Sequence, residues 1–139
     1  MVATRFAVAT HILLYLATEG SGGGSTSVRL AYSVNTNPVV VRRIAGQLAR
    51  AGLIRVRRGP GGAELAREPA HITLEDVWHA VQAAPTGTLL PIHRRPNMAC
   101  PVGRRVRPVL GEAFAGAEAA LHQVLADTTL DRLTAALAR

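Results

Sequence analysis

The sequence has a single cysteine, Cys100, and no lysine among its 16 basic residues. One cysteine excludes an internal disulfide framework. A set of cations made up only of arginine suits planar, bidentate contacts to phosphate or guanine, although genomic base composition also produces such a set. Aromatic residues make up only 4% of the chain, and Ala, Leu and Val dominate. This composition predicts a mainly α fold and excludes a large all-β core.

Long apolar runs are also missing. No stretch approaches the roughly 18 uninterrupted apolar residues that a membrane-spanning helix requires. The apolar start, MVATRFAVATHILLYLA, is interrupted by Arg5 and His11 and has no basic leader or small-residue cleavage site, which favours a core helix over a signal peptide. We therefore expect a soluble, cytoplasmic protein with no membrane partner. The length of 139 residues suits one globular domain with an appended helix.

Acidic residues are scarce where basic residues are densest. The chain has a formal net charge of +7. Residues 42–67 contain seven arginines and one acid, Glu64, so a local charge of +6 lies in this stretch. A basic segment of this kind indicates a nucleic acid as the partner.

Apolar periodicity predicts three helices in the first half of the chain. Residues 6–17 carry apolar side chains at three- and four-residue steps and precede the loop GSGGGS. Ser27 is placed to cap a short helix that stops at the polar turn Asn35-Thr36-Asn37. A third helix begins at Pro38 and has Gly52 as its C-cap. Its predicted buried face comprises Val41, Ile44, Leu48 and Ala51.

Two helices about three residues apart, the second with Arg42 and Arg43 in its first turns, are the layout of a helix-turn-helix. The alternation LIRVRR, the run GPGG and the segment AELA then predict a β-hairpin with a glycine-rich tip, which would be the wing. The helix ITLEDVWHAVQ, with Thr73 and Asp76 close to a capping box, is expected to close the core.

The second half of the chain contains a loop and a long amphipathic helix. Residues 85–101 are rich in proline and polar residues. Apolar residues then recur at helical spacing from Val106 to Leu125, and Thr128 or Thr129 caps a final short helix. So long a stripe outside a compact core predicts a homodimer. We expect a winged helix-turn-helix domain at 1–84, a linker or sensor loop at 85–101, and a dimerisation helix with a C-terminal helix at 102–139.

Six segments together resemble the Rrf2 family of bacterial regulators over nearly the whole chain. They are LLYLA, NTNPVVVRRIAGQLARAGLI, RRGPGGAEL, ITLEDVWHAV, CPVG and TLDRL. The resemblance implies a winged-helix DNA-binding domain, a long helix exchanged or paired between subunits, and repression at palindromic sites. Cluster-binding relatives use three cysteines before the long helix, where this chain has only Cys100. CPVG resembles the branch without the cluster, so we expect no iron–sulfur cofactor.

The predicted DNA-binding residues lie in the third helix and the wing. Arginine early in a recognition helix can donate two hydrogen bonds to guanine, and a glycine-rich tip can approach a phosphate or a narrow minor groove. The resemblance adds three residues at the start of the third helix. The plainer interpretations are solvated surface charge for the arginines and core packing for the valines. The full set is Asn37, Val39, Val40, Arg42, Arg43, Arg57, Arg58, Gly59 and Gly61.

Cys100 is a candidate redox sensor, because His93 and several arginines are near it in sequence and nearby cations lower a thiol pKa. The alternative is a small buried hydrophobe. The five histidines show no close pairing with each other, and only the seven-residue gap between His93 and Cys100 is a metal-ligand spacing. No nucleophile, base and orienting group are placed together. We expect no metal site, no catalytic residues and no enzyme.

The sequence thus predicts a sequence-specific regulator that binds double-stranded DNA as a homodimer, with repression as the expected action. A small-molecule or redox effector acting at the linker would control it. Two alternatives stay open. A non-specific basic nucleic-acid-binding protein would share the charge but would not need the long apolar helix. A protein-interaction adaptor would keep that helix but would not need the arginine pair.

Overall fold

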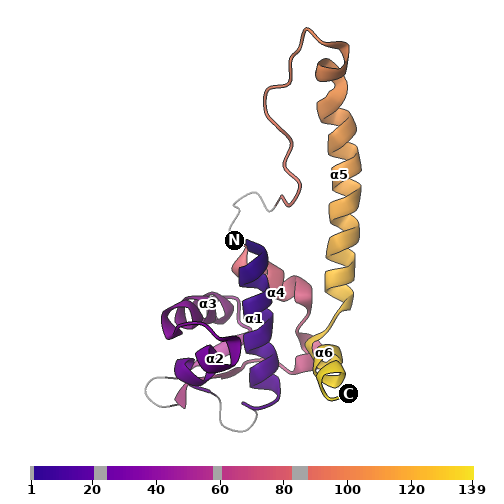
Figure 1. The fold of residues 1–139 in the computed structure, drawn as a ribbon. Helices are drawn as coiled ribbons and strands as arrows, with labels where there is room; N and C mark the ends of the chain where they lie inside the picture. The colour runs from indigo at the N-terminus through magenta and orange to yellow at the C-terminus, as the bar shows by residue number, and fades with distance from the viewer. Residues whose placement is uncertain (1, 21–24, 58–60, 83–87) are drawn as a thin grey trace. The chain divides into compact units, whose positions relative to one another are not determined.

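The computed structural model describes residues 2–20, 25–57, 61–82 and 88–139, and it confirms the mainly α winged helix-turn-helix fold (Figure 1). The chain divides into two compact units, one of residues 1–83 and 125–139 and one of residues 84–124. The helices are α1 (Val2–Ala17), α2 (Ser27–Val34), α3 (Pro38–Arg50), the short 3₁₀ helix η2 (Pro69–His71), α4 (Leu74–Val81), α5 (Pro101–Asp127) and α6 (Leu130–Leu137). The strands are β1 (Ile54–Val56) and β2 (Ala63–Leu65).

Helix α1 is the centre of the first unit. It packs against α2, α3, α4 and α6, which surround it in Figure 1. Its consecutive residues Ile12 and Leu13 are both fully buried, as expected for a helix covered on more than one side. At its N-terminal end, Phe6 meets Trp78 of α4 edge to face with ring centroids 5.3 Å apart. The predicted apolar start is therefore a core helix.

The caps of α2 and α3 shape the helix-turn-helix. The hydroxyl of Thr26, and not that of Ser27, accepts from the backbone of α2, so the predicted cap was one residue too late. Asn35 ends α2 with a φ of 66°, in the left-handed region. The predicted C-cap glycine of α3 lies one position beyond the cap residue Ala51, and its φ of 77° suits glycine. Ala51 itself is exposed and does not join the buried face.

The wing is held to the rest of the unit by a third segment. Strands β1 and β2 are antiparallel, with Arg55 opposite Glu64. Ser25 extends the pairing, because it exchanges two backbone hydrogen bonds with Ala63. A Cβ at Gly62 would lie 2.1 Å from the carbonyl oxygen of Ser25, so this position requires glycine. Residues 58–60 of the predicted tip lie outside the described residues.

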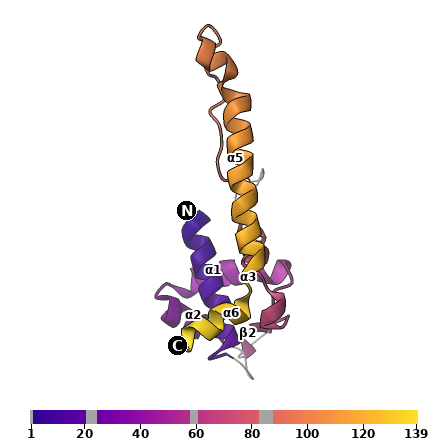
Figure 2. The ribbon, with the colours of Figure 1, turned by 90° about the vertical axis from the view of Figure 1, so that its right-hand side faces the viewer.

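Helices α4 and α6 complete the first unit. Thr73 and Asp76 form the predicted capping box, with both of its hydrogen bonds present. Helix α6 packs against α1 and η2. The amide of Leu130 donates to the carbonyl of Ile72 at 2.8 Å, which ties the start of α6 to the core. The predicted segment 102–139 thus contributes its last helix, α6, to the first unit, where it lies beside α1 (Figure 2).

The second unit consists of most of α5 and the segment that precedes it. Residues 88–100 run back along α5 (Figure 1). The carboxylate of Glu118 accepts from the amides of Leu89 and Leu90 at 2.8 and 2.7 Å, and Arg107 donates to the carbonyl of His93 at 2.5 Å. One side of α5 is therefore covered by its own chain.

Within the described ranges, no helix combines the length and the apolar character that a membrane span requires.

Candidate nucleic-acid interface

Helix α3 presents a basic stripe to solvent. Val41, Ile44 and Leu48 are buried, whereas Arg42, Arg43 and Arg50 are exposed. The apolar residues recur at three- and four-residue steps, so they take one side of the helix and leave the arginines for the other. The structure thus places both predicted base-reading arginines on the accessible face of the second helix of the motif.

The side chain of Arg42 is anchored by the neighbouring helix. Its Nη1 donates to the hydroxyl of Ser27 at 3.2 Å, across the helix-turn-helix. A guanidinium has five N–H donors, so this bond leaves Arg42 able to donate to a base edge or a phosphate. Ser27, predicted as a cap, therefore positions an arginine.

The three residues at the start of α3 differ in their surroundings. The side-chain oxygen of Asn37 caps the helix by accepting from the amide of Val40 at 3.0 Å. Val40 is half-buried and packs on the core, whereas Val39 is 55% exposed. Asn37 and Val39 are thus the exposed members of this group, and Val40 is the member that contributes to packing.

In the wing, two arginines share one carboxylate. Arg57 Nη2 lies 2.8 Å and Arg55 Nε 3.5 Å from Oε1 of Glu64. The hydrogen bond from Arg57 is the main reason that the pKa of Glu64 is lowered from its ordinary value. A Cβ at Gly61 would lie 3.0 Å from Cβ of Arg57, so Gly61 gives that side chain room. The predicted site residues Arg58 and Gly59 lie outside the described residues.

Helix α2 adds exposed residues that the sequence analysis did not select. Tyr32 is 89% exposed, Val28 is 65% exposed, and Arg29 is also exposed. The first helix of a helix-turn-helix crosses the DNA backbone, and both Tyr and Arg donate hydrogen bonds to phosphates. The three- and four-residue spacing of these residues on a helix already predicted was the signal that could have identified them.

Cys100 lies at the start of α5 and is exposed, which contradicts the buried alternative. Backbone amides of Gly103 and Val102 donate to its sulfur and lower the pKa of the thiol. The expected cause had been the neighbouring cations, and the helix amides are the cause instead. A Cβ at Gly103 would lie 2.1 Å from the carbonyl oxygen of Asn97, so glycine is required there.

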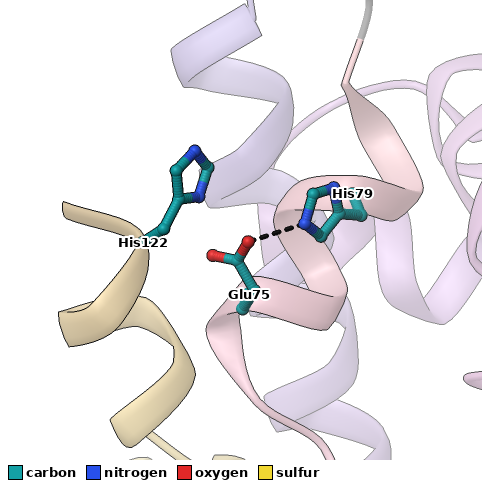
Figure 3. Close-up of side chains that lie close together, drawn as sticks. All are labelled: Glu75, His79 and His122. Atoms are coloured by element: carbon teal, nitrogen blue, oxygen red, sulfur yellow. Dashed lines mark hydrogen bonds and ion pairs between the residues drawn. The ribbon is translucent and has the colours of Figure 1, made fainter. Parts of the chain in front are cut away.

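Two histidines on helices of the first unit, His79 and His11, are exposed but hydrogen-bonded. His79 Nε2 lies 2.6 Å from Oε1 of Glu75, one turn earlier on α4 (Figure 3). His11 Nε2 lies 2.9 Å from the hydroxyl of Ser33. These side chains tie surface positions together and are separate from the basic face of α3.

Comparison with known proteins gives the same architecture. The Rrf2 family model, described as an iron-dependent transcriptional regulator, matches residues 2–136. YwnA of Bacillus subtilis (strain 168) is 39% identical over 130 residues, which are 94% of each chain. Its name gives an HTH-type transcriptional regulator as an inferred role.

Solved structures also match over most of their length. A crystal structure named for an inferred DNA-binding protein is 37% identical, covers 93% of this chain and 97% of its own, and has a TM-score of 0.73. Staphylococcus aureus CymR is 23% identical, covers 94% of this chain and 95% of its own, and has a TM-score of 0.72. At that identity, CymR shows a shared fold alone.

Proposed function

The chain belongs to the Rrf2 family and is a DNA-binding transcriptional regulator, and from this premise we propose that it is a repressor that binds palindromic operators as a homodimer. The observation that carries the proposal is the exposed arginine stripe of α3 beside an arginine-bearing wing. We place its action in the cytoplasm, without catalytic activity. Repression follows from the family resemblance.

In the proposed complex, the start of α3 enters the major groove. Arg42 and Arg43 donate to base edges, and Val39 contacts a thymine methyl group. Asn37 and Val40 hold the helix start near the groove by capping and packing. Arg57 approaches the backbone or the adjacent minor groove, and Arg58 and Gly59 are predicted from the sequence to contribute to the same contact.

The homodimer is proposed from the two sides of α5. Arg107, Gly111 and Glu118 lie on the side that contacts residues 89–93 of the same chain. The opposite side follows helical spacing through Val102, Val109, Ala113, Gly116, Ala120 and Val124, and all six are exposed. Apolar side chains at this spacing and exposure favour burial against another helix, which a second copy of α5 supplies.

A redox response is proposed at Cys100. Its exposure and amide hydrogen bonds favour the thiolate, the form that reacts with oxidants and electrophiles. Oxidation at this position would change the separation of the two recognition helices in the dimer. A small-molecule inducer is the competing effector, and it would act equally on Cys100→Ser protein.

We propose no iron–sulfur cluster for this member of the family. Protein-bound clusters are held mainly by several thiolates, and this chain contains one cysteine. The single sulfur does not fit that donor set. Protein purified without oxygen should therefore show no cluster absorbance in the visible range, and such absorbance at stoichiometric iron would contradict the proposal.

Fluorescence anisotropy tests the function directly. The probes are a duplex selected from a random pool by the wild-type protein and a scrambled duplex, at two salt concentrations. We expect a strong preference for the selected duplex, lost in the Arg42→Ala and Arg43→Ala double variant, with full affinity only for two half-sites about one helical turn apart. Equal, salt-sensitive binding to both duplexes would support the non-specific alternative.

A further inference from the structure

A groove of about 510 Å³ lies between α3 and the wing. Its α3 side includes three small residues, Ala45, Gly46 and Ala49, together with Val41, and Val56 and Ala63 of the two strands also line it. Arg42 and Arg57 line the same groove. Thr26 and Ser27, at the N-terminal end of α2, also contribute to it. The groove therefore combines a lining rich in small residues with two arginines.

Gly46 is the unexplained residue of this groove. It occupies the middle of α3, where glycine is among the least favourable helix residues. A Cβ built on it would meet only the Nη1 atom of Arg50, at 3.6 Å, which is an ordinary contact. Gly62 and Gly103 differ, because a Cβ there would collide with backbone atoms at 2.1 Å. Nothing within the described fold requires glycine at position 46.

The two arginines of the groove are both oriented by neighbours. Arg42 donates to Ser27 at 3.2 Å, and Arg57 donates to Glu64 at 2.8 Å. Each guanidinium has five N–H donors, so one bond to a neighbour fixes its direction and leaves donors for a ligand. Two arginines beside a lining of small residues can donate hydrogen bonds to an anionic chain that passes along the groove.

We propose that this groove seats the sugar–phosphate strand that separates the major groove from the adjacent minor groove, and that Gly46 is glycine because this strand passes close to α3. The inference rests on the DNA-binding function. A helix in the major groove and a hairpin directed at the minor groove must have one backbone strand between them. Absence of a side chain is what close approach to a ligand backbone requires.

The test uses Gly46→Ala and Gly46→Leu, with Ala51→Leu as the matched control. Ala51 is exposed at the end of the same helix and does not line the groove. The probe is the duplex selected by the wild-type protein. We expect Gly46→Ala to raise the thermal midpoint, because alanine favours helix, and yet to weaken binding about tenfold, as overpacking at a close contact does. Gly46→Leu should bind more weakly still, and Ala51→Leu should bind as wild type does.

The outcomes separate the inference from the function beneath it. If the wild-type protein binds DNA and the Gly46→Ala and Gly46→Leu variants bind it with unchanged affinity, the proposed position of the backbone strand is wrong. The DNA-binding function would then still hold. Failure of the wild-type protein to bind the selected duplex would remove both. A second readout is independent of Gly46: Arg57→Ala should reduce the salt slope of log affinity by about one. An unchanged slope in the Arg57→Ala variant would also overturn the proposal.

Discussion

At the scale of single residues, Glu64 is the acid that pairs with two arginines of the wing. Its carboxylate holds Arg57 and Arg55 while they remain 61% and 65% exposed. A carboxylate so placed restrains both arginines and lowers the positive charge that DNA meets. It therefore favours binding at sites where the wing geometry is right over binding to any phosphate backbone.

We predict that Glu64→Gln makes binding less selective. Loss of the negative charge releases the arginines for additional phosphate contacts, so the salt slope should steepen by about one and scrambled DNA should be bound more tightly. Titrations of selected and scrambled duplexes at several salt concentrations measure both effects. Unchanged slopes would show that Glu64 has no such role.

Glu64 also predicts a pH dependence of stability. The hydrogen bond from Arg57 lowers the pKa of Glu64 in the folded protein. The stability that the ionised Glu64 carboxylate adds is therefore fully present above its pKa in the unfolded chain, and it is lost as the pH falls through its pKa in the folded protein. Urea unfolding across the acid range should show a loss in the wild type that is smaller in Glu64→Gln. Parallel profiles for the two proteins would contradict this.

Cys100 gives a prediction of reactivity. The amides of Gly103 and Val102 lower the pKa of its thiol, so more of it is thiolate at neutral pH than in a free cysteine. The pH profile of iodoacetamide alkylation in the native protein should therefore have a lower midpoint than that of the urea-unfolded protein. Identical midpoints would remove the basis for a sensor at this position.

At the scale of elements, the start of α3 combines capping with DNA approach. We predict that Asn37→Ala lowers the free energy of unfolding by about 1 kcal/mol, whereas Asn37→Ser retains the cap and nearly all of the stability. Asn37→Asp also retains the cap but adds a negative charge where DNA would lie, so it should bind more weakly than Asn37→Ser. Equal DNA affinity of the Asp and Ser variants would place position 37 away from the DNA.

At the scale of the whole molecule, the proposed homodimer rests on the exposed side of α5. We predict that Val109→Arg, which puts a charge at a residue 64% exposed on that side, yields monomers and lowers affinity for two-half-site DNA. Sedimentation of the free protein and anisotropy measure the two effects. Ala115→Arg, exposed on a different side of the helix, is the control and should remain a dimer. Dimeric Val109→Arg protein would contradict the proposed interface.

Local rules were enough for most elements of this chain. Pro38 starts α3, Gly52 follows it, and Thr73 with Asp76 begins α4, as their spacing predicts. These features concern backbone groups within one helical turn, so residue identity and order determine them. The predicted cap of α2 was Ser27, one residue after the observed cap Thr26, because both neighbouring residues carry a hydroxyl that can cap the helix.

Long-range contacts required the tertiary structure. The packing of α6 on α1, the anchoring of Arg42 by Ser27 and the groove beside Gly46 all join residues that are separated in the chain. The sequence by itself determined the helix-turn-helix, the hairpin and the concentration of arginine, because these follow from periodicity and composition. Only the tertiary structure decided which arginines are oriented and what space lies between them, because both depend on how the elements pack.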